Sequence, residues 1–145
     1  MRINQVLAAK ANHEVITVSP EATVRELLAL MAANNVGALV VSSDGKRLDG
    51  IVSERDVVRR LTEREDLLDA RVDSIMTVEV RTCERDQRVN DMMQVMTEHR
   101  IRHLPVVEGD ELVGIISIGD VVKSRMSELE FERDQLDSYV HRAQT

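Results

Sequence analysis

Short blocks of apolar residues divide the chain, and their spacing alternates between that of a strand and that of a helix. Residues 15–18 form a β-branched run, and residues 24–31 then place apolar side chains on one helical face. Apolar runs at 38–41 and 48–52 flank a polar turn that contains glycine, as in a β-hairpin. Residues 53–61 follow the helical period again. The order strand, helix, strand, strand, helix predicts one βαββα unit.

Residues at the ends of the first predicted helix support its boundaries. Thr23 is followed three residues later by Glu26, the arrangement of a capping box, in which each side chain accepts a hydrogen bond from the other residue's backbone N–H. Asn34 and Asn35 come at the other end, and asparagine tolerates the left-handed backbone that ends many helices. The helix is therefore expected to begin after Thr23 and to end near Asn35.

The unit occurs twice. A shift of 65 residues aligns Val15, Thr17 and Val41 with Val80, Thr82 and Val106. A one-residue deletion in the hairpin turn, where length changes cost little, then aligns Gly50, Ser53 and Asp56 with Gly114, Ser117 and Asp120. The repeated pattern predicts an α/β fold (α+β in some schemes) made of two βαββα repeats and a C-terminal helix.

The repeats also predict the domain boundaries. The first repeat covers residues 2–62 and the second covers residues 72–124. Residues 63–71 are charged and predict a surface linker between them. Residues 125–145 predict a helical tail.

An apolar stripe runs along the predicted tail. Its members follow alternating steps of four and three residues, interrupted by Arg133, and they are Val122, Met126, Leu129, Leu136 and Val140. Such a stripe has to be buried against something. The sequence leaves two possibilities open, which are packing back onto the same module and contact between two copies in a homodimer.

Composition and charge narrow the class of protein. A chain of 145 residues that is 43% hydrophobic can bury a core, which argues against disorder. Phe131 and Tyr139 are the only aromatic residues, so the core is aliphatic and the stacking surfaces of single-strand nucleic-acid binders are missing. The net charge of −7 also disfavours contact with a phosphate backbone. We therefore expect no nucleic-acid partner.

Cysteine and histidine positions give no sign of a metal site. Cys83 is the only cysteine, which excludes an intrachain disulfide and a cysteine zinc cluster. His99 and His103 are four residues apart, but a helix end and a strand start are predicted between them. The N-terminal residues lack a signal-peptide pattern, and no stretch reaches the ~18 apolar residues of a membrane helix. A cytoplasmic location, without membrane contact, is expected.

Several motifs, in the same order in both copies, resemble the tandem cystathionine-β-synthase (CBS) domain pair, also called a Bateman module. They are VDSIMT at 72–77, RHLPVV at 102–107, GIISIGDV at 114–121 and GIVSERDV at 50–57. The resemblance implies a pseudo-two-fold pair of repeats with two clefts between their sheets. It further implies an adenine-nucleotide ligand in these clefts, with AMP expected and ATP, NAD or S-adenosylmethionine as alternatives, and no catalytic cofactor.

The resemblance also assigns roles to individual residues. In one cleft, Ile16, Thr17, Ala38, Ser117 and Asp120 would hold the adenine and the ribose, and Arg102 and His103 would hold the phosphate. In the other cleft the corresponding set is Thr82, Ser53, Arg55 and Asp56. Each Ser-x-x-Asp has a second interpretation, because a serine and an aspartate at this spacing cap a helix. The two interpretations are compatible, since a helix N-terminus suits a polar ligand.

The two clefts are expected to differ in charge. Gly37 and Ala38 of the first copy occupy the positions of Arg102 and His103 in the second. A guanidinium fork and a protonated imidazole both suit a phosphate. By this assignment the cleft that contains Asp120 binds more tightly, and Arg55 compensates only in part in the other.

These observations favour a regulatory sensor over two rival classes. An enzyme would need a nucleophile, a base or a metal cluster, and Cys83 has no recognisable base beside it in the sequence. A purely structural interaction module would have the same fold with no ligand. We expect a homodimeric nucleotide sensor that is not an enzyme and that shifts its helix packing when the ligand binds.

Overall fold

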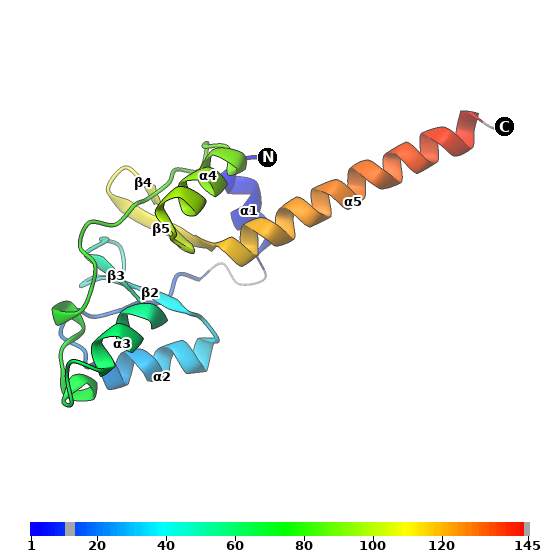
Figure 1. Ribbon diagram of the computed structural model, residues 1–145. Helices are drawn as coiled ribbons and strands as arrows, with labels where there is room; N and C mark the ends of the chain where they lie inside the picture. The colour runs from blue at the N-terminus through cyan, green and yellow to red at the C-terminus, as the bar shows by residue number, and fades with distance from the viewer. Residues whose placement is uncertain (11–13, 144–145) are drawn as a thin grey trace.

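The structure is a computed structural model that describes residues 1–10 and 14–143, and it contains two similar units and one long projecting helix (Figure 1). The first unit consists of β1 (Thr17–Val18), α2 (Val24–Asn34), β2 (Ala38–Val41), β3 (Gly50–Ser53) and α3 (Glu54–Leu61). The second unit consists of α4 (Val89–His99), β4 (His103–Glu108), β5 (Glu111–Ser117) and α5 (Ile118–Ala143). Helix α1 (Ile3–Ala9) precedes the first unit, and two short 3-10 helices, Leu67–Asp69 and Val72–Ser74, lie between the units. The predicted fold class is confirmed.

The caps that the sequence predicts are present. The hydroxyl oxygen of Thr23 accepts a hydrogen bond from the backbone N–H of Glu26 (3.2 Å), and the Glu26 carboxylate accepts one from the backbone N–H of Thr23 (3.3 Å). Helix α2 ends at Asn35, whose φ of 52° is left-handed. Arg100 takes the same conformation after α4, with a φ of 53°. The first long helix of each unit therefore ends in the same left-handed conformation, although only α2 has asparagine at that position.

The two sheets differ in their first strand. In the first unit β1 is parallel to β2, which is antiparallel to β3, whereas β4 and β5 form a two-stranded antiparallel sheet. The strand expected near Thr82 is reduced to one parallel bridge between Cys83 and Val106. Cys83 donates to the carbonyl of Pro105 (3.0 Å) and accepts from the N–H of Val107 (2.9 Å). The ladder stops there because Pro105 has no N–H to donate toward Arg81.

Each unit is covered by the segment that precedes the other one. Leu67, Val72 and Ile75, which come just before the second unit, are buried in the core of the first. Ile3 and Val6, which come before the first unit, are buried in the core of the second. The two units are therefore interlocked. The surface linker predicted at 63–71 differs from the structure at Leu67, which is 1% exposed.

Paired backbone hydrogen bonds join each of these preceding segments to the unit that it covers. The N–H of Val24 donates to the carbonyl of Ala70 (2.9 Å), and the N–H of Val72 donates to the carbonyl of Ala22 (2.8 Å). At the matching place in the second unit, Ile3 donates to Gln87 (3.0 Å) and Val89 donates to Met1 (3.1 Å). The same pair of bonds in both halves reflects the pseudo-two-fold relation of the repeats.

Gly50 is the first residue of one Gly-x-x-Ser-x-x-Asp motif. It packs against Met76 and Thr77, which follow the segment that covers the first unit. A Cβ at position 50 would lie 2.8 Å from Met76 Sδ and 2.8 Å from the carbonyl oxygen of Thr77. That carbonyl is fixed, because Thr77 exchanges two backbone hydrogen bonds with Ile51. Close packing therefore requires glycine at this position.

Replacing Gly50 with alanine is expected to lower the free energy of unfolding by about 1–3 kcal/mol, since the backbone has to move to relieve the overlap. At Gly114 an added Cβ would meet Leu7 Cδ2 at 2.8 Å, which is the end of a flexible side chain. Gly114→Ala should therefore cost less. Urea unfolding of both variants measures the difference, and a larger loss for Gly114→Ala would contradict this account of the packing.

Helix α5 runs without a break from the second unit into the tail. It extends away from both units in Figure 1, so the boundary predicted at residue 125 lies inside one continuous helix. The stripe residues are exposed, with fractions of 44% for Val122, 57% for Met126 and 65% for Leu136. In this structure the stripe does not pack back onto its own module. Among the described residues no helix combines the length and the apolar character that crossing a membrane requires.

Candidate functional site

Two cavities lie between the units. One has a volume of about 700 Å³ and contains Asp120, and the other has a volume of about 780 Å³ and contains Asp56. We name them the Asp120 cavity and the Asp56 cavity. Both fall in the size range of small-molecule sites, about 300–1,000 Å³. Ala38 lines both cavities, so the start of β2 lies between them.

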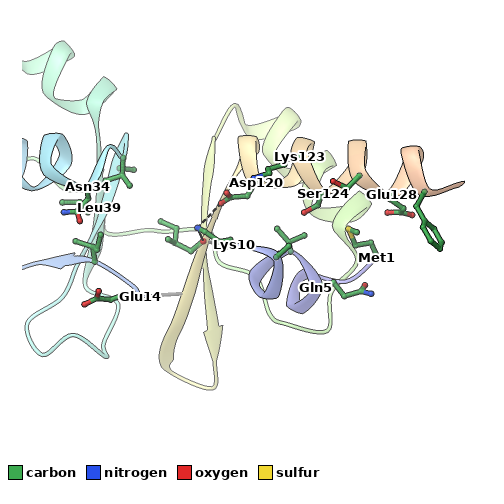
Figure 2. A pocket seen from close by; sticks show the side chains of 18 residues that line it. Met1, Gln5, Lys10, Glu14, Asn34, Leu39, Asp120, Lys123, Ser124 and Glu128 are labelled. Atoms are coloured by element: carbon green, nitrogen blue, oxygen red, sulfur yellow. Dashed lines mark hydrogen bonds and ion pairs between the residues drawn. The ribbon is translucent and has the colours of Figure 1, made fainter. Parts of the chain in front are cut away.

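The Asp120 cavity brings together distant parts of the chain (Figure 2). Ile16 and Ala38 come from the first unit, and Asp120 comes from the start of α5, as the sequence predicts. Thr17 and Ser117 do not line this cavity. Other walls come from Met1, from α1 with Gln5, and from the tail side of α5, with Lys123, Ser124, Ser127, Glu128 and Phe131.

Asp120 both caps α5 and forms an ion pair. Its Oδ2 accepts a hydrogen bond from the backbone N–H of Ser117 (2.9 Å), and its own N–H donates to Ser117 Oγ (3.1 Å). Lys10 Nζ lies 3.1 Å from the same Oδ2 and donates to the carbonyl of Ile115 (2.8 Å). Burial raises the pKa of Asp120, but the Ser117 bond and Lys10 outweigh it and hold that pKa below its ordinary value. This carboxylate therefore already has a cation as its partner.

Glu128 adds an unsatisfied acceptor to the Asp120 cavity. Its Oε1 lies 3.2 Å from Arg125 Nη1, whereas its Oε2 is buried and has no hydrogen-bond partner. The charged groups that line the cavity are Lys10, Lys123, Glu14, Asp120 and Glu128, and the remaining lining is largely apolar. This balance suits a ligand that donates hydrogen bonds more than it suits a phosphate.

The Asp56 cavity is strongly cationic. Its lining includes five arginines, Arg55, Arg59, Arg81, Arg100 and Arg102, and two histidines, His99 and His103, against the three carboxylates Glu54, Asp56 and Glu79. Three residues predicted for this cleft, Ser53, Arg55 and Asp56, line it, and Thr82 does not. The neighbouring residues Val80 and Arg81 take the place expected for Thr82.

The lining of the cavities differs from the predicted grouping of Arg102 and His103 with Asp120, although Asp120 is the charged group that acts most strongly on the His103 imidazole. The structure places both residues in the Asp56 cavity. The physical reason is that the two units pack face to face, which brings the start of β4 in the second unit to the same cavity as the start of α3 in the first. An alignment of the two copies compares equivalent positions and carries no information on this crossing.

The Asp56 carboxylate is held in the same way as Asp120 but beside different neighbours. Its Oδ2 accepts from the backbone N–H of Ser53 (2.8 Å) and from Ser53 Oγ (3.1 Å). The Asp56 N–H donates to Ser53 Oγ (3.4 Å), which completes the capping box of α3. The capping interpretation is therefore confirmed at both motifs. A carboxylate has up to four acceptor positions, so capping is compatible with a ligand contact.

His103 is half-buried at the edge of the Asp56 cavity. Burial lowers the pKa of its imidazole, and the nearby Arg102 lowers it further, against an opposing effect of Asp120. Burial therefore favours the neutral form of this side chain. A bound anion would raise this pKa, and a proton taken up from solvent would then add a positive charge beside Arg102.

Cys83 and His99 do not form a reactive centre. Cys83 is buried, and this burial raises the pKa of its thiol to about 12, which makes it a poor nucleophile. His99 lines the Asp56 cavity, a role that its spacing from His103 did not suggest. Within the part of the chain that the structure describes, no group of three or more His, Cys, Asp or Glu side chains could hold a metal ion.

Several residues of the cavities escaped the sequence reasoning. Arg59, Arg81 and Arg100 have no motif around them, and only their position in the fold brings them to Asp56. Arg100 carried one usable signal, because it stands where the first copy has Asn35 at a helix end. Lys10 is 110 positions away from Asp120 in the sequence, and no pattern connects them.

Two interlocked repeats, the second with its first strand reduced to one bridge, form a tandem-repeat module with two cavities between them. Comparisons with known proteins assign this module to a family. The sequence profile of the CBS domain matches residues 6–63 and 72–127. The chain is 36% identical over 114 residues to the CBS domain-containing protein YhcV of Bacillus subtilis, covering 79% of this chain and 81% of that protein. The chain belongs to the CBS domain family.

Solved structures agree with this assignment. The CBS-domain containing protein ATU1752 from Agrobacterium tumefaciens is 36% identical, with a TM-score of 0.81 over 86% of this chain and 92% of that one. The CBS domain protein PAE2072 from Pyrobaculum aerophilum, whose structure is a complex with AMP, is 32% identical, with a TM-score of 0.72 over 83% of this chain and 89% of that one. The tandem CBS pair inferred from the motifs is confirmed.

Proposed function

We propose that this protein is a regulatory sensor that binds an adenine nucleotide in the Asp56 cavity and does not catalyse a reaction. The observation that carries the proposal is a cavity lined by five arginines together with a helix-capping carboxylate. A nucleotide needs both features, because its phosphate is anionic and its ribose carries two adjacent hydroxyl donors. The AMP bound to the related PAE2072 supports the same ligand class.

The expected contacts follow from the chemistry of each group. Asp56 accepts hydrogen bonds from the ribose hydroxyls, and the N-terminus of α3 adds a favourable partial charge. Arg102 and its cationic neighbours hold the phosphate through charge-assisted hydrogen bonds, which contribute roughly 1.5–3 kcal/mol each. AMP is the expected ligand, and ATP, NAD and S-adenosylmethionine remain alternatives.

A ligand between the units can act on the helices around it. Residues of both units line each cavity, so a nucleotide that contacts both units favours one arrangement of the units relative to each other. Helix α5 carries Asp120 and also lines the Asp120 cavity with Lys123 and Glu128. A change at the interface can therefore reach the projecting helix, which is the part of the molecule best placed to signal to a partner.

Thermal unfolding of the full chain with each candidate ligand tests this function. A ligand at 100 times its dissociation constant stabilises the fold by about 2.7 kcal/mol, which raises the melting temperature by several degrees. The account expects such a shift with AMP. No shift with AMP, ATP, NAD or S-adenosylmethionine at millimolar concentration would favour a structural module without a ligand, and turnover of any of them would favour an enzyme.

The pH dependence of AMP binding tests the role of His103. Because burial lowers the pKa of this imidazole, it gains its charge only as the pH falls below the ordinary value of 6.5. AMP affinity should therefore rise modestly as the pH decreases through and below that value. The phosphate protonates in a similar range, so calorimetry of His103→Gln is the control, and an equal pH response in that variant would exclude His103 as the source.

The same depressed pKa has the opposite effect on the protein without ligand. The unfolded chain binds more protons at His103 than the folded chain does below pH 6.5, so the free energy of unfolding decreases as the pH falls there. In the His103→Gln variant this contribution is absent. Ligand affinity and stability of the free protein are thus expected to change in opposite directions over one pH range.

A further inference from the structure

The exposed stripe of α5 has the period of a coiled coil. Its positions are Val122, Met126, Leu129, Arg133, Leu136 and Val140, separated by steps of four and three residues. We call them the α5 stripe. A seven-residue apolar repeat is the pattern that packs one helix against another over several turns. Leu129 and Val140, 52% and 49% exposed, are as open to solvent as the rest of the stripe.

The α5 stripe faces away from its own module. Val121 and Ser124 are buried, and Glu128 and Phe131 line the Asp120 cavity. At 3.6 residues per turn these four side chains lie on the side or the rear of α5 relative to the stripe. The helix also leaves both units after its first turns (Figure 1). No described part of the same chain is therefore placed to cover it.

We propose that the α5 stripe pairs with the α5 stripe of a second copy in an antiparallel two-stranded coiled coil. A second copy carries an apolar face of the same period and length, and it is present wherever the chain is. Isolated helices are marginal in water, and most helical stability in proteins comes from packing of an apolar face. Pairing of this kind supplies that packing for the whole tail and goes beyond the proposed nucleotide binding.

Charge decides the direction of the two helices. In a parallel pair, Arg125 would lie near Glu130 of the second copy, but Arg133 would face Arg133 and Glu132 would lie near Asp137, so like charges would also meet. In an antiparallel pair with Met126 opposite Leu136 of the second copy, Arg133 lies beside Leu129 and within reach of two glutamates, Glu130 and Glu132, of the second copy. The same register brings Lys123 near Asp137 of the second copy. The same register sets Glu130 near Glu130 and Glu132 near Glu132 of the second copy, so the antiparallel direction rests on the contacts of Arg133 and Lys123.

Disulfide trapping in the full chain tests direction and register at once. The chain contains one cysteine, Cys83, which is buried and therefore does not compete. Met126→Cys and Leu136→Cys are made separately, one of them with a tag that changes its mass, and are oxidised alone and after mixing. The antiparallel register predicts a cross-linked species of mixed mass and little cross-linking of either variant alone. Self-cross-linking of each variant, or no mixed species, would overturn the proposal.

Aspartate substitutions test whether the stripe holds the copies together. Leu129→Asp places a charge in the stripe and is expected to raise the dimer dissociation constant at least tenfold. Phe131→Asp is the matched control, because Phe131 is 62% exposed and lies on the opposite side of the same helix. Light scattering over a dilution series, without nucleotide, measures both.

The outcomes separate this proposal from nucleotide binding. A strong effect of Leu129→Asp with little effect of Phe131→Asp supports the α5 pair, whatever the ligand experiments show. A monomeric wild-type chain, or equal effects of the two substitutions, would overturn it. Both positions are exposed, so the far-ultraviolet circular dichroism of each variant should remain that of a folded protein.

Discussion

Replacing Asp56 with alanine is expected to abolish the tighter AMP-binding event, whereas Asp120→Ala is expected to leave it nearly unchanged. Asp56 shares its cavity with five arginines, and Asp120 is already paired with Lys10 at 3.1 Å. Loss of the hydrogen bonds from two ribose hydroxyls to a carboxylate, at roughly 1.5–3 kcal/mol each, weakens binding by roughly a hundredfold to ten-thousandfold. Calorimetric titration of both variants with AMP measures the effect.

Controls for this prediction have to separate binding from folding. Asp56 also caps α3, so its removal costs some stability, on the order of 1 kcal/mol. Asp56→Asn keeps the size of the side chain and much of the cap, and it is expected to lose affinity while it unfolds near the wild-type temperature. If Asp120→Ala proves to be the damaging change, the dominant ligand lies in the other cavity.

Leu67→Ala lowers the free energy of unfolding by about 2–5 kcal/mol, which is the second large effect expected. Leu67 precedes the second unit but is 1% exposed in the core of the first, so truncation leaves a cavity there. A leucine in a surface linker would tolerate the change within about 0.5 kcal/mol. Leu61, 54% exposed at the end of α3, is the matched control. Equal losses for Leu61→Ala and Leu67→Ala in urea unfolding would contradict the interlocked packing.

Local structure was largely predictable from the sequence. The Thr23–Glu26 capping box and the left-handed Asn35 are where the residues place them, because both depend on contacts within a few positions. The strand near Thr82 was not predicted correctly. Its length depends on a missing N–H at Pro105, a residue on another strand whose pairing the local pattern does not reveal.

The sequence predicted individual residues of the candidate site, but not which of these residues share a cavity. Asp56 and Asp120 each occupy a cavity, as the motifs indicate. Packing between the units decides which residues lie beside each carboxylate. Arg102 lines the cavity of Asp56, and Lys10 forms the ion pair with Asp120. For this reason we now expect the tighter AMP site at Asp56 rather than at Asp120.

Calorimetric titration of the wild-type chain with AMP and with adenosine tests the central claim most directly. The account predicts saturable binding of AMP that is at least tenfold tighter than that of adenosine, because only AMP carries a phosphate for the arginines of the Asp56 cavity. Equal affinity for the two ligands would contradict the role given to these arginines. Absence of saturable AMP binding would contradict the assignment of AMP as the expected ligand.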